Sequence, residues 1–362
     1  MAPRQDVRFC TAADGTRLAV ASVGSGPPLV RAAHWLSHVE RDLESPVWRP
    51  WVHELSRHHT YIRYDQRGCG LSDRTLAGLS VDHFVGDLEI VVDQLGLERF
   101  PLIGMSQGGI VAMRYAHRHP ERVSALVLVG AYARGALRRA ASDLERLEAD
   151  TLVNLIRVGW GRDNDAFRQV FTNQYIPEGT AEQHRWWNDL ERISASPEGA
   201  ARTLAAFHDA DVTETAAGLR VPTLVVHSRR DARVPFDEGR RLAALIPGAR
   251  FLALESANHV LLEVEPAFAV FVEALYDFIG ATAAPPAAGT TGTTRASLTP
   301  LTGAEAAVLE LLARGLDNHA IARHLGKSEK TVRNQVSTIF DKLGVRTRAE
   351  AIVHAIGVRP PR

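Results

Sequence analysis

The chain has 362 residues, of which 42 are basic and 42 acidic, so its formal net charge is zero. This length allows two domains. No stretch approaches the ~20 consecutive apolar residues of a membrane-spanning helix, and the N-terminus lacks the apolar core of a signal peptide. Two cysteines, Cys10 and Cys69, indicate no disulfide framework and are typical of a reducing compartment. We therefore expect a cytoplasmic protein without a membrane partner.

From Leu29 to about Phe278, short apolar runs alternate with stretches that can form helices. β-branched runs separated by helices are typical of a parallel sheet covered on both faces. Two earlier runs joined by Asp14-Gly15 predict an antiparallel hairpin at one edge. The pattern predicts an α/β sheet of roughly eight strands. No Gly-x-Gly-x-x-Gly follows a strand, which disfavours a dinucleotide site. The candidate strands are PPLVRAA, HHTYIRYD, RFPLIGM, VSALVLV, PTLVVHS and ARFLALE.

Ser106 lies where a predicted strand meets a predicted helix. The run RFPLIGM leads directly into Gly104-Met105-Ser106-Gln107-Gly108, a G-x-S-x-G pattern. Small flanking residues permit a turn that is too tight for a Cβ, and such a turn presents a serine hydroxyl as a nucleophile. The alternative is a glycine-rich turn with an ordinary serine.

Asp231 and His259 follow the last two predicted strands, PTLVVHS and ARFLALE. The chain order Ser, Asp, His is the one that α/β-hydrolases use. In this interpretation His259 takes the proton from Ser106, while Asp231 fixes the imidazole tautomer and stabilises its charged form. A loop histidine considered alone would be an ordinary surface residue.

Between about residues 133 and 219 the strand rhythm gives way to a helical pattern, which predicts a lid. Three of the six tryptophans of the chain lie there, Trp160, Trp186 and Trp187. They suggest an aromatic roof of a ligand pocket over Ser106. The alternative, that they pack the lid against the sheet, is open for each of them.

The body resembles the α/β-hydrolase superfamily from about Gly15 to Phe278. RYDQRGCGLSD, residues 63–73, matches the esterase, lactonase and dehalogenase-like branch, and a serine nucleophile favours acyl chemistry. The resemblance implies an oxyanion hole formed by the backbone N–H groups of Trp35 and Gln107. Ala33-His34 replaces the usual His-Gly, which requires His34 to keep a negative φ.

The C-terminal stretch predicts a small helical domain. Thr302 with Glu305 forms a capping box for a first helix. A second helix is expected at about 318–325, a third after the cap Ser328, and a fourth after a second capping box, Thr347 with Glu350. We expect residues 1–279 to form the sensor or catalytic domain, 280–297 an Ala-, Pro-, Gly- and Thr-rich flexible linker, and 298–362 the DNA-binding domain.

The second and third of these helices form a helix-turn-helix pattern with a polar, basic outer face. From Ser297 on, ten Lys and Arg stand against six Asp and Glu, a net of +4, which leaves −4 for the body. The segment resembles the C-terminal domain of LuxR-family transcriptional regulators almost from end to end. The resemblance implies that Arg333, Asn334 and Ser337 face base edges and that the fourth helix pairs with a second copy. Phosphate contacts are expected from Lys327, Lys330, Thr331, Lys342, Arg346 and Arg348.

Three functions fit this sequence. The first is a DNA-binding transcriptional regulator whose hydrolase-like domain binds a small apolar ester or lactone, with or without hydrolysing it. The second is a serine esterase or lactonase with an accessory DNA-binding tail. The third is a pure receptor, in which the triad residues serve ligand hydrogen bonding or a single slow covalent turnover. A homodimer on double-stranded DNA is expected, because two recognition helices must meet half-sites about 34 Å apart. No cofactor and no metal is implied, since the histidines lack zinc-type spacing. A phosphorelay receiver is disfavoured by the absence of acidic strand ends near the N-terminus.

Overall fold

The structure is a computed structural model that describes residues 4–74, 77–283, 301–313, 316, 318–343 and 351. The chain forms two compact units, an N-terminal unit, Met1–Pro285, and a C-terminal unit, Pro286–Arg362. Each unit has its own hydrophobic core.

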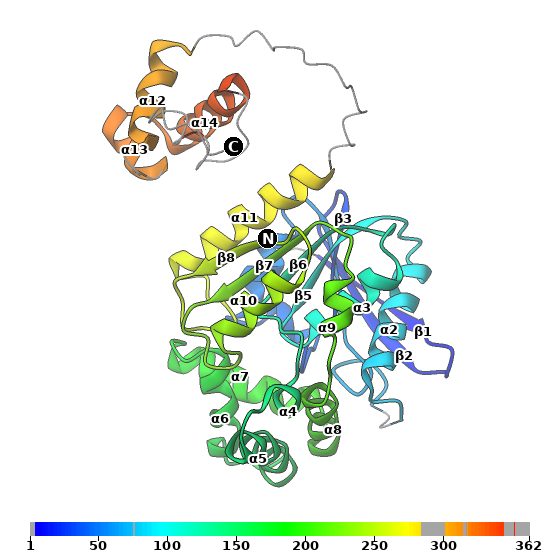
Figure 1. Cartoon of the computed structure of the whole chain (residues 1–362). Coiled ribbons are helices and arrows are strands. Elements are labelled where there is room, and N and C mark those ends of the chain that lie inside the picture. The colour runs from blue at the N-terminus through cyan, green and yellow to red at the C-terminus, as the bar shows by residue number, and fades with distance from the viewer. Residues whose placement is uncertain are drawn as a thin grey trace. The chain divides into compact units, whose positions relative to one another are not determined.

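The N-terminal unit is built on one eight-stranded sheet in the order β1-β2-β4-β3-β5-β6-β7-β8 (Figure 1). The β1–β2 and β2–β4 pairs are antiparallel and all other pairs are parallel, which confirms the predicted sheet. The hairpin turns at Gly15, whose φ is +85°, and the Asp14 carboxylate accepts the Thr16 N–H at 3.0 Å. The strands are Gln5–Thr11 (β1), Arg17–Val23 (β2), Pro28–Arg31 (β3), Thr60–Tyr64 (β4), Phe100–Met105 (β5), Val123–Val129 (β6), Thr223–Ser228 (β7) and Arg250–Leu254 (β8).

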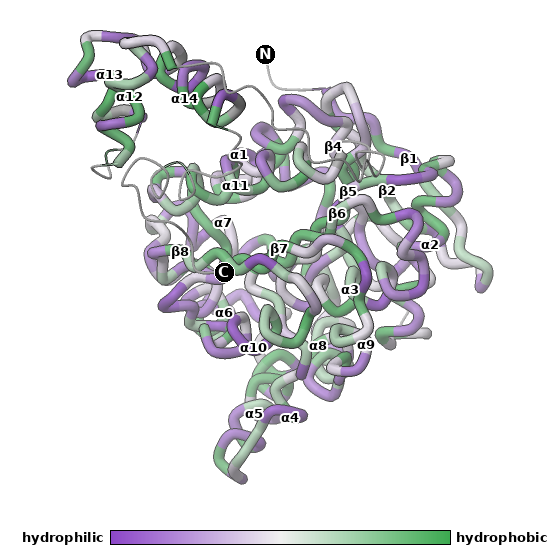
Figure 2. The backbone as a smooth tube through the Cα atoms, turned by 45° about the horizontal axis from the view of Figure 1, so that its top comes forward, coloured by the Kyte–Doolittle hydropathy of each residue, from purple (hydrophilic) through white to green (hydrophobic). Residues whose placement is uncertain are grey.

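Helices cover both faces of the sheet, as Figures 1 and 2 show. Alternate residues of β6 belong to different cores: Ala125 and Val127 pack with one helix layer, Leu126 and Leu128 with the other. This period of two explains why the strands are apolar without interruption. One layer contains α1 (Trp48–Leu55) and α11 (Pro266–Ala283), and the other contains α2 (Val81–Gln94), α3 (Gly108–Arg118) and α10 (Phe236–Leu245).

The expected helical insertion lies between β6 and β7. Its helix α7 begins with a complete capping box, in which Thr180 and Gln183 bond reciprocally, and α8 begins with the cap Ser196 followed by Pro197. The last helix, α9, packs against α3, so α4 to α8 form the lid. The helices are Ala136–Arg139 (α4), Asp143–Gly159 (α5), Ala166–Tyr175 (α6), Ala181–Ser194 (α7), Pro197–His208 (α8) and Thr213–Ala217 (α9); a short 3₁₀ turn, η1, spans Arg41–Leu43.

Helix α11 continues to Ala283, four residues into the segment expected to be the linker. Alanine favours helix there, and the Thr282 hydroxyl bonds back to the Ile279 carbonyl at 3.0 Å. Residues 284–297 of the expected linker lie outside the described residues. No helix in the described part is long and apolar enough to cross a membrane.

The C-terminal unit contains α12 (Gly303–Ala313), α13 (Asn318–Leu325) and α14 (Glu329–Leu343). The predicted capping box is present: the Thr302 N–H donates to Glu305 at 2.7 Å, and the Glu305 N–H donates to the Thr302 hydroxyl at 3.3 Å. Val332 and Ile339 of α14 are fully buried against the other two helices. The predicted fourth helix lies outside the described residues.

Candidate functional site

Ser106 occupies a sharp turn between β5 and α3. Its φ of +51° is left-handed, a conformation that costs an L-residue about 1–2 kcal/mol and is found where a side chain is held for function. The flanking glycines make the turn possible. A Cβ at Gly104 would lie 2.7 Å from the Ala112 Cβ, and one at Gly108 would lie 2.7 Å from the Ala33 carbonyl oxygen. The turn therefore has the geometry that the G-x-S-x-G pattern implies.

Asp231 follows β7, and His259 lies in the loop after β8. His259 Nδ1 and Asp231 Oδ2 are 2.7 Å apart, and both side chains are 1% exposed. Asp231 Oδ1 accepts the Arg233 and Val234 backbone N–H groups at 2.8 and 2.9 Å. Burial alone would raise the pKa of Asp231, but the attraction and hydrogen bond of His259 outweigh it and hold this pKa below its usual value. Asp231 is thus an ionised acceptor that orients the imidazole.

The second imidazole nitrogen of His259 is buried and has no hydrogen-bond partner among the described residues. His259 and Ser106 line one cavity. The backbone N–H groups of His259 and Val260 both donate to the Tyr175 carbonyl, at 2.9 and 3.0 Å, which ties the histidine loop to lid helix α6. A Cβ at Gly130, where φ is +56°, would lie 2.8 Å from His259 Cε1. The structure thus brings the three expected residues together.

The cavity at Ser106 is small and mostly aromatic. Its volume is about 20 Å³, room for about one water molecule. The lid contributes Tyr175 and Trp187, whose rings stack 5.4 Å apart. Sites for small molecules typically measure about 300–1,000 Å³, so rings fill the space that a ligand would need. The lining residues are His34, Trp35, Trp48, Met105, Ser106, Tyr175, Trp187, His259 and Val260.

Of the three tryptophans expected in the roof, Trp187 alone is among the described lining residues. Trp160 lies one layer behind, buried against Trp35 with ring centroids 5.5 Å apart. Trp186 is half-buried and packs against the same core. Neighbouring residues of a helix point in directions about 100° apart, so Trp186 and Trp187 do not share one cavity wall.

The two expected oxyanion donors adjoin Ser106. Trp35 lines the cavity, and Gln107 follows Ser106 directly at the start of α3. The backbone N–H of each is without a partner within the described ranges. His34 does not adopt a positive φ. Among the described non-glycine residues, a positive φ is found at Ser106 and at Leu36, where it is +58°. His34 therefore replaces the usual glycine without left-handed strain at its own position.

His34 was not expected in the cavity wall. Its ring stacks on Trp48 with centroids 4.7 Å apart, and its Nδ1 lies 3.0 Å from the Trp35 carbonyl oxygen. Burial, and then the charge of Arg31, lower the pKa of His34 well below its usual value, so the imidazole is neutral. Trp48 carries no sequence signal for this role, because it reaches the cavity through the packing of its helix. Tyr175 is one of several aromatic residues of the lid, and composition alone does not single it out.

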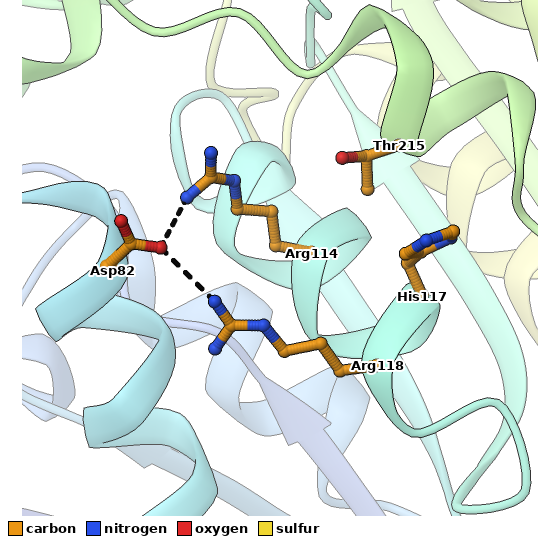
Figure 3. A pocket seen from close by; sticks show the side chains of 5 residues that line it. All are labelled: Asp82, Arg114, His117, Arg118 and Thr215. Carbon is orange, nitrogen blue, oxygen red and sulfur yellow. Dashed lines mark hydrogen bonds and ion pairs between the residues drawn. The ribbon is translucent and has the colours of Figure 1, made fainter.

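A larger hollow, of about 230 Å³, lies between α2, α3 and α9 (Figure 3). Asp82 pairs there with Arg114 at 2.6 Å and with Arg118 at 3.2 Å, and its side chain is 69% exposed. Ion pairs of this kind are solvated and contribute little. His117 and Thr215 complete the lining, which shares no residue with the cavity at Ser106. The hollow is a surface groove and not part of the candidate site. No three His, Cys, Asp or Glu side chains gather as a metal site requires in the ranges that are described.

Two of the three side chains expected to read DNA bases are exposed on α14. Arg333 and Asn334 are both exposed, and Arg333 lies 3.6 Å from Glu329 in a surface pair that DNA can displace. The Thr331 hydroxyl is 2.7 Å from that of Ser328 at the start of the helix. The side chains of Lys330 and Ser337, and the whole of Arg346 and Arg348, lie outside the described residues.

Two lysines expected on DNA phosphates have partners inside the domain. Lys342 Nζ contacts both Glu305 carboxylate oxygens, at 2.9 and 2.7 Å, and so joins α14 to α12. This bond, with the Thr302 N–H, lowers the pKa of Glu305 to about 2. Lys327 Nζ donates to Gln335 at 2.9 Å. Lys342 therefore takes part in packing the helices through a nearby carboxylate, and its contact with a DNA phosphate stays a prediction.

Residues 42–266 match the alpha/beta hydrolase fold family, and residues 299–355 match the luxR family of bacterial regulatory proteins. The first match spans more than half of the chain, so the protein belongs to the alpha/beta hydrolase family. A LuxR-type DNA-binding domain is fused to it. Both predicted resemblances are confirmed.

Individual relatives agree with this assignment. A putative carbamate hydrolase, RutD, of Azorhizobium caulinodans is 32% identical over 244 residues, which cover 64% of this chain and 86% of that protein. The AB hydrolase superfamily protein YisY of Bacillus subtilis is 28% identical over 247 residues, 67% of this chain and 88% of YisY. The structure of an esterase from Exiguobacterium antarcticum superposes with a TM-score of 0.65 at 27% identity, covering 75% of this chain and 98% of the esterase.

Proposed function

We propose that this protein is a transcriptional regulator whose hydrolase domain binds and cleaves a small ester or lactone with an apolar part, and that this event changes how the LuxR-type domain binds DNA. One observation carries the proposal. A LuxR-type domain and a buried, hydrogen-bonded His259–Asp231 pair beside Ser106 occur in a single chain.

The chemistry follows from the positions of the side chains. The Ser106 hydroxyl oxygen attacks the acyl carbon while His259 takes its proton, and the leaving alcohol receives that proton as the acyl–serine bond forms. The N–H groups of Trp35 and Gln107 stabilise the oxyanion. Water, deprotonated by His259, then releases the acid and restores Ser106. Asp231 stabilises the imidazolium in both steps.

The small cavity supports a link between ligand and lid. A ligand enters the cavity only when Tyr175 and Trp187 move, and both belong to lid helices. The Tyr175 carbonyl also holds the His259 loop, so lid position and imidazole position are coupled. Regulation then requires that the ligand bind the DNA-competent and the incompetent states with different affinity. The regulator acts as a homodimer, because paired recognition helices meet two half-sites.

A receptor without turnover is the second candidate, favoured by a cavity of only about 20 Å³ and by His34 in place of the usual glycine. The Ser106→Ala variant separates the two. We expect wild type to hydrolyse members of a p-nitrophenyl ester and lactone panel and the variant to lose that activity while retaining its fold. Turnover that survives in Ser106→Ala contradicts the catalytic proposal.

The regulatory half of the proposal needs DNA. In a gel-retardation assay, the full chain should bind promoter fragments from the neighbouring genes. Its affinity for these fragments should change when an ester that the protein hydrolyses is added. Arg333→Ala with Asn334→Ala should abolish specific retardation, whereas Arg229→Ala, an exposed arginine of the hydrolase domain paired with Glu255, should not. Operator affinity that is unchanged by every hydrolysed ester contradicts ligand control.

A further inference from the structure

A second group of polar side chains lies beside the candidate active site. Arg233 Nε donates to the Tyr175 hydroxyl at 3.3 Å, and Arg233 Nη1 donates to Gln174 at 3.4 Å. The guanidinium lies 5.8 Å from the centre of the Tyr175 ring. That ring lines the cavity at Ser106 and lies 5.5 Å from the ring of His259. Arg233 is therefore one side chain away from the cavity.

A second guanidinium, Arg139, belongs to the same group. Arg139 lies 5.5 Å from the centre of the Tyr132 ring, and it is close enough to Arg233 that their charges repel. Three chain segments meet here: the stretch after β6 with Tyr132 and α4, the end of α8 with His208, and the loop after β7. Gly135 allows the first two to touch, because a Cβ there would collide with the last carbonyl oxygens of α8.

Neither Arg139 nor Arg233 forms a salt bridge within the described part of the chain, although both are half-buried. The nearby carboxylates are already engaged. Asp231 bonds to His259 at 2.7 Å, and Glu238 pairs with two other arginines at 3.0 and 3.8 Å. Arg139 donates to the Arg134 carbonyl at 3.3 Å, but neither guanidinium has a carboxylate of its own within ion-pair distance in the described part of the chain. Two such charges in a partly desolvated place are costly unless an anion joins them.

His208 supplies an independent observation. It is 2% exposed, and its one polar contact among the described residues is a weak one to the Ala149 backbone. Burial, together with the charges of Arg233 and Arg139, lowers its pKa to about 3, so it is neutral. A buried neutral imidazole beside two cations, with its hydrogen-bonding capacity only partly used, is the surrounding that a polar ligand group would complete.

We propose that Arg139 and Arg233 bind a carboxylate of the ligand, so that the substrate is an ester or lactone that also carries a free acid group. This inference rests on the proposed function, because the acid group is placed relative to Ser106. Guanidinium groups match a carboxylate with paired, charge-assisted hydrogen bonds. The acid group occupies the cationic end beyond Tyr175, and the apolar part of the ligand occupies the aromatic cavity.

The test compares two esters of matched shape, p-nitrophenyl hydrogen glutarate, whose acid is ionised at neutral pH, and neutral p-nitrophenyl valerate. We expect wild type to prefer the acid, and Arg139→Gln to lower kcat/KM for the acid by about tenfold or more while sparing the neutral ester. Arg233→Gln should also abolish the preference for the acid. Arg139→Lys should retain part of the preference. Arg138→Gln is the matched control, since Arg138 is the neighbouring residue on α4 and pairs with Asp209 at 2.9 Å. Equal losses for both esters in Arg139→Gln overturn the proposal.

A binding experiment distinguishes the carboxylate site from the proposed catalysis. With the full-length Ser106→Ala chain, glutarate should raise the unfolding temperature and neutral glutaramide should not, and the shift should vanish in Ser106→Ala with Arg139→Gln. Stabilisation by glutarate without hydrolysis of any ester in wild type supports the carboxylate site while contradicting the proposed catalysis. No effect of glutarate, together with no preference for the acidic ester, refutes the carboxylate site.

Discussion

Replacing Gly130 with alanine tests how tightly the histidine–aspartate pair is held. The added Cβ would lie 2.8 Å from His259 Cε1 and 3.6 Å from Asp231 Oδ2. Carbon atoms pack at about 3.5–4.0 Å, so the imidazole must move by roughly 1 Å. A misplacement of about 1 Å in a reacting group costs on the order of 100-fold in rate. Overpacking adds about 1–3 kcal/mol of destabilisation to the ~1–2 kcal/mol that a left-handed alanine costs.

Gly96→Ala is the matched control for this change. Gly96 has a similar φ, +63° against +56°, but no atom lies within 4 Å of an added Cβ. It therefore carries the backbone penalty without the collision. We expect Gly96→Ala to lower the free energy of unfolding by about 1–2 kcal/mol and Gly130→Ala by about 2–5 kcal/mol.

Two measurements decide the outcome. Urea unfolding gives the stabilities, and the second-order rate of labelling by a fluorophosphonate reports the nucleophilicity of Ser106 whatever the natural substrate is. Gly130→Ala should be labelled about 100-fold more slowly than wild type, and Gly96→Ala at the wild-type rate. If the two variants unfold and react alike, the close packing of Gly130 against His259 is refuted.

Three further predictions concern charged groups. Asp87 pairs with the buried Arg67 guanidinium, whose other partner is the half-exposed Asp14 at 2.6 Å. Asp87→Ala removes the buried partner and should cost up to about 3–5 kcal/mol in urea unfolding, whereas Asp82→Ala on the same helix, 69% exposed, should cost at most about 1 kcal/mol; similar losses would contradict this. Asp231→Asn should slow p-nitrophenyl ester hydrolysis by about 10⁴-fold at unchanged stability, and a loss below about tenfold would argue against a triad. Glu305 has its pKa lowered to about 2, so its bond to Lys342 stabilises the C-terminal unit fully above its unfolded pKa of about 4.3 and less as the pH falls through 2. Hydrogen exchange of α12 along a descending pH series should show that loss in wild type and its absence in Lys342→Met.

The sheet and the nucleophile turn were predictable because local patterns determine them. A buried parallel strand needs an uninterrupted apolar run, as in VSALVLV, where alternate side chains enter two different cores. The turn at Ser106 needs small neighbours at both flanks, and the glycines that supply them are visible as a motif. The order of Ser106, Asp231 and His259 added the remaining information, since each follows a strand whose carboxyl end faces the same edge of the sheet.

The partners of individual side chains were not predictable in the same way. Lys342 is predicted to contact a DNA phosphate because it is basic and follows the recognition surface, but its pairing with Glu305, 37 residues earlier, could not be predicted from the sequence. Trp186 and Trp187 are indistinguishable by composition, and only the rotation of α7 decides which one reaches the cavity. Arg139 and Arg233 gave no signal at all, because they meet only when the stretch after β6 and the loop after β7 come together.

Under the proposed function, Tyr175 is the residue that joins ligand binding to lid movement. Its ring lines the cavity, its hydroxyl accepts a hydrogen bond from Arg233, and its carbonyl accepts the backbone N–H groups of His259 and Val260. A ligand that needs more space than one water molecule displaces this ring or the helix α6 that carries it. Because the same residue holds the histidine loop, we expect occupancy of the cavity to change both the lid and the loop, and under the proposed function this change is the first step of a signal to the DNA-binding domain.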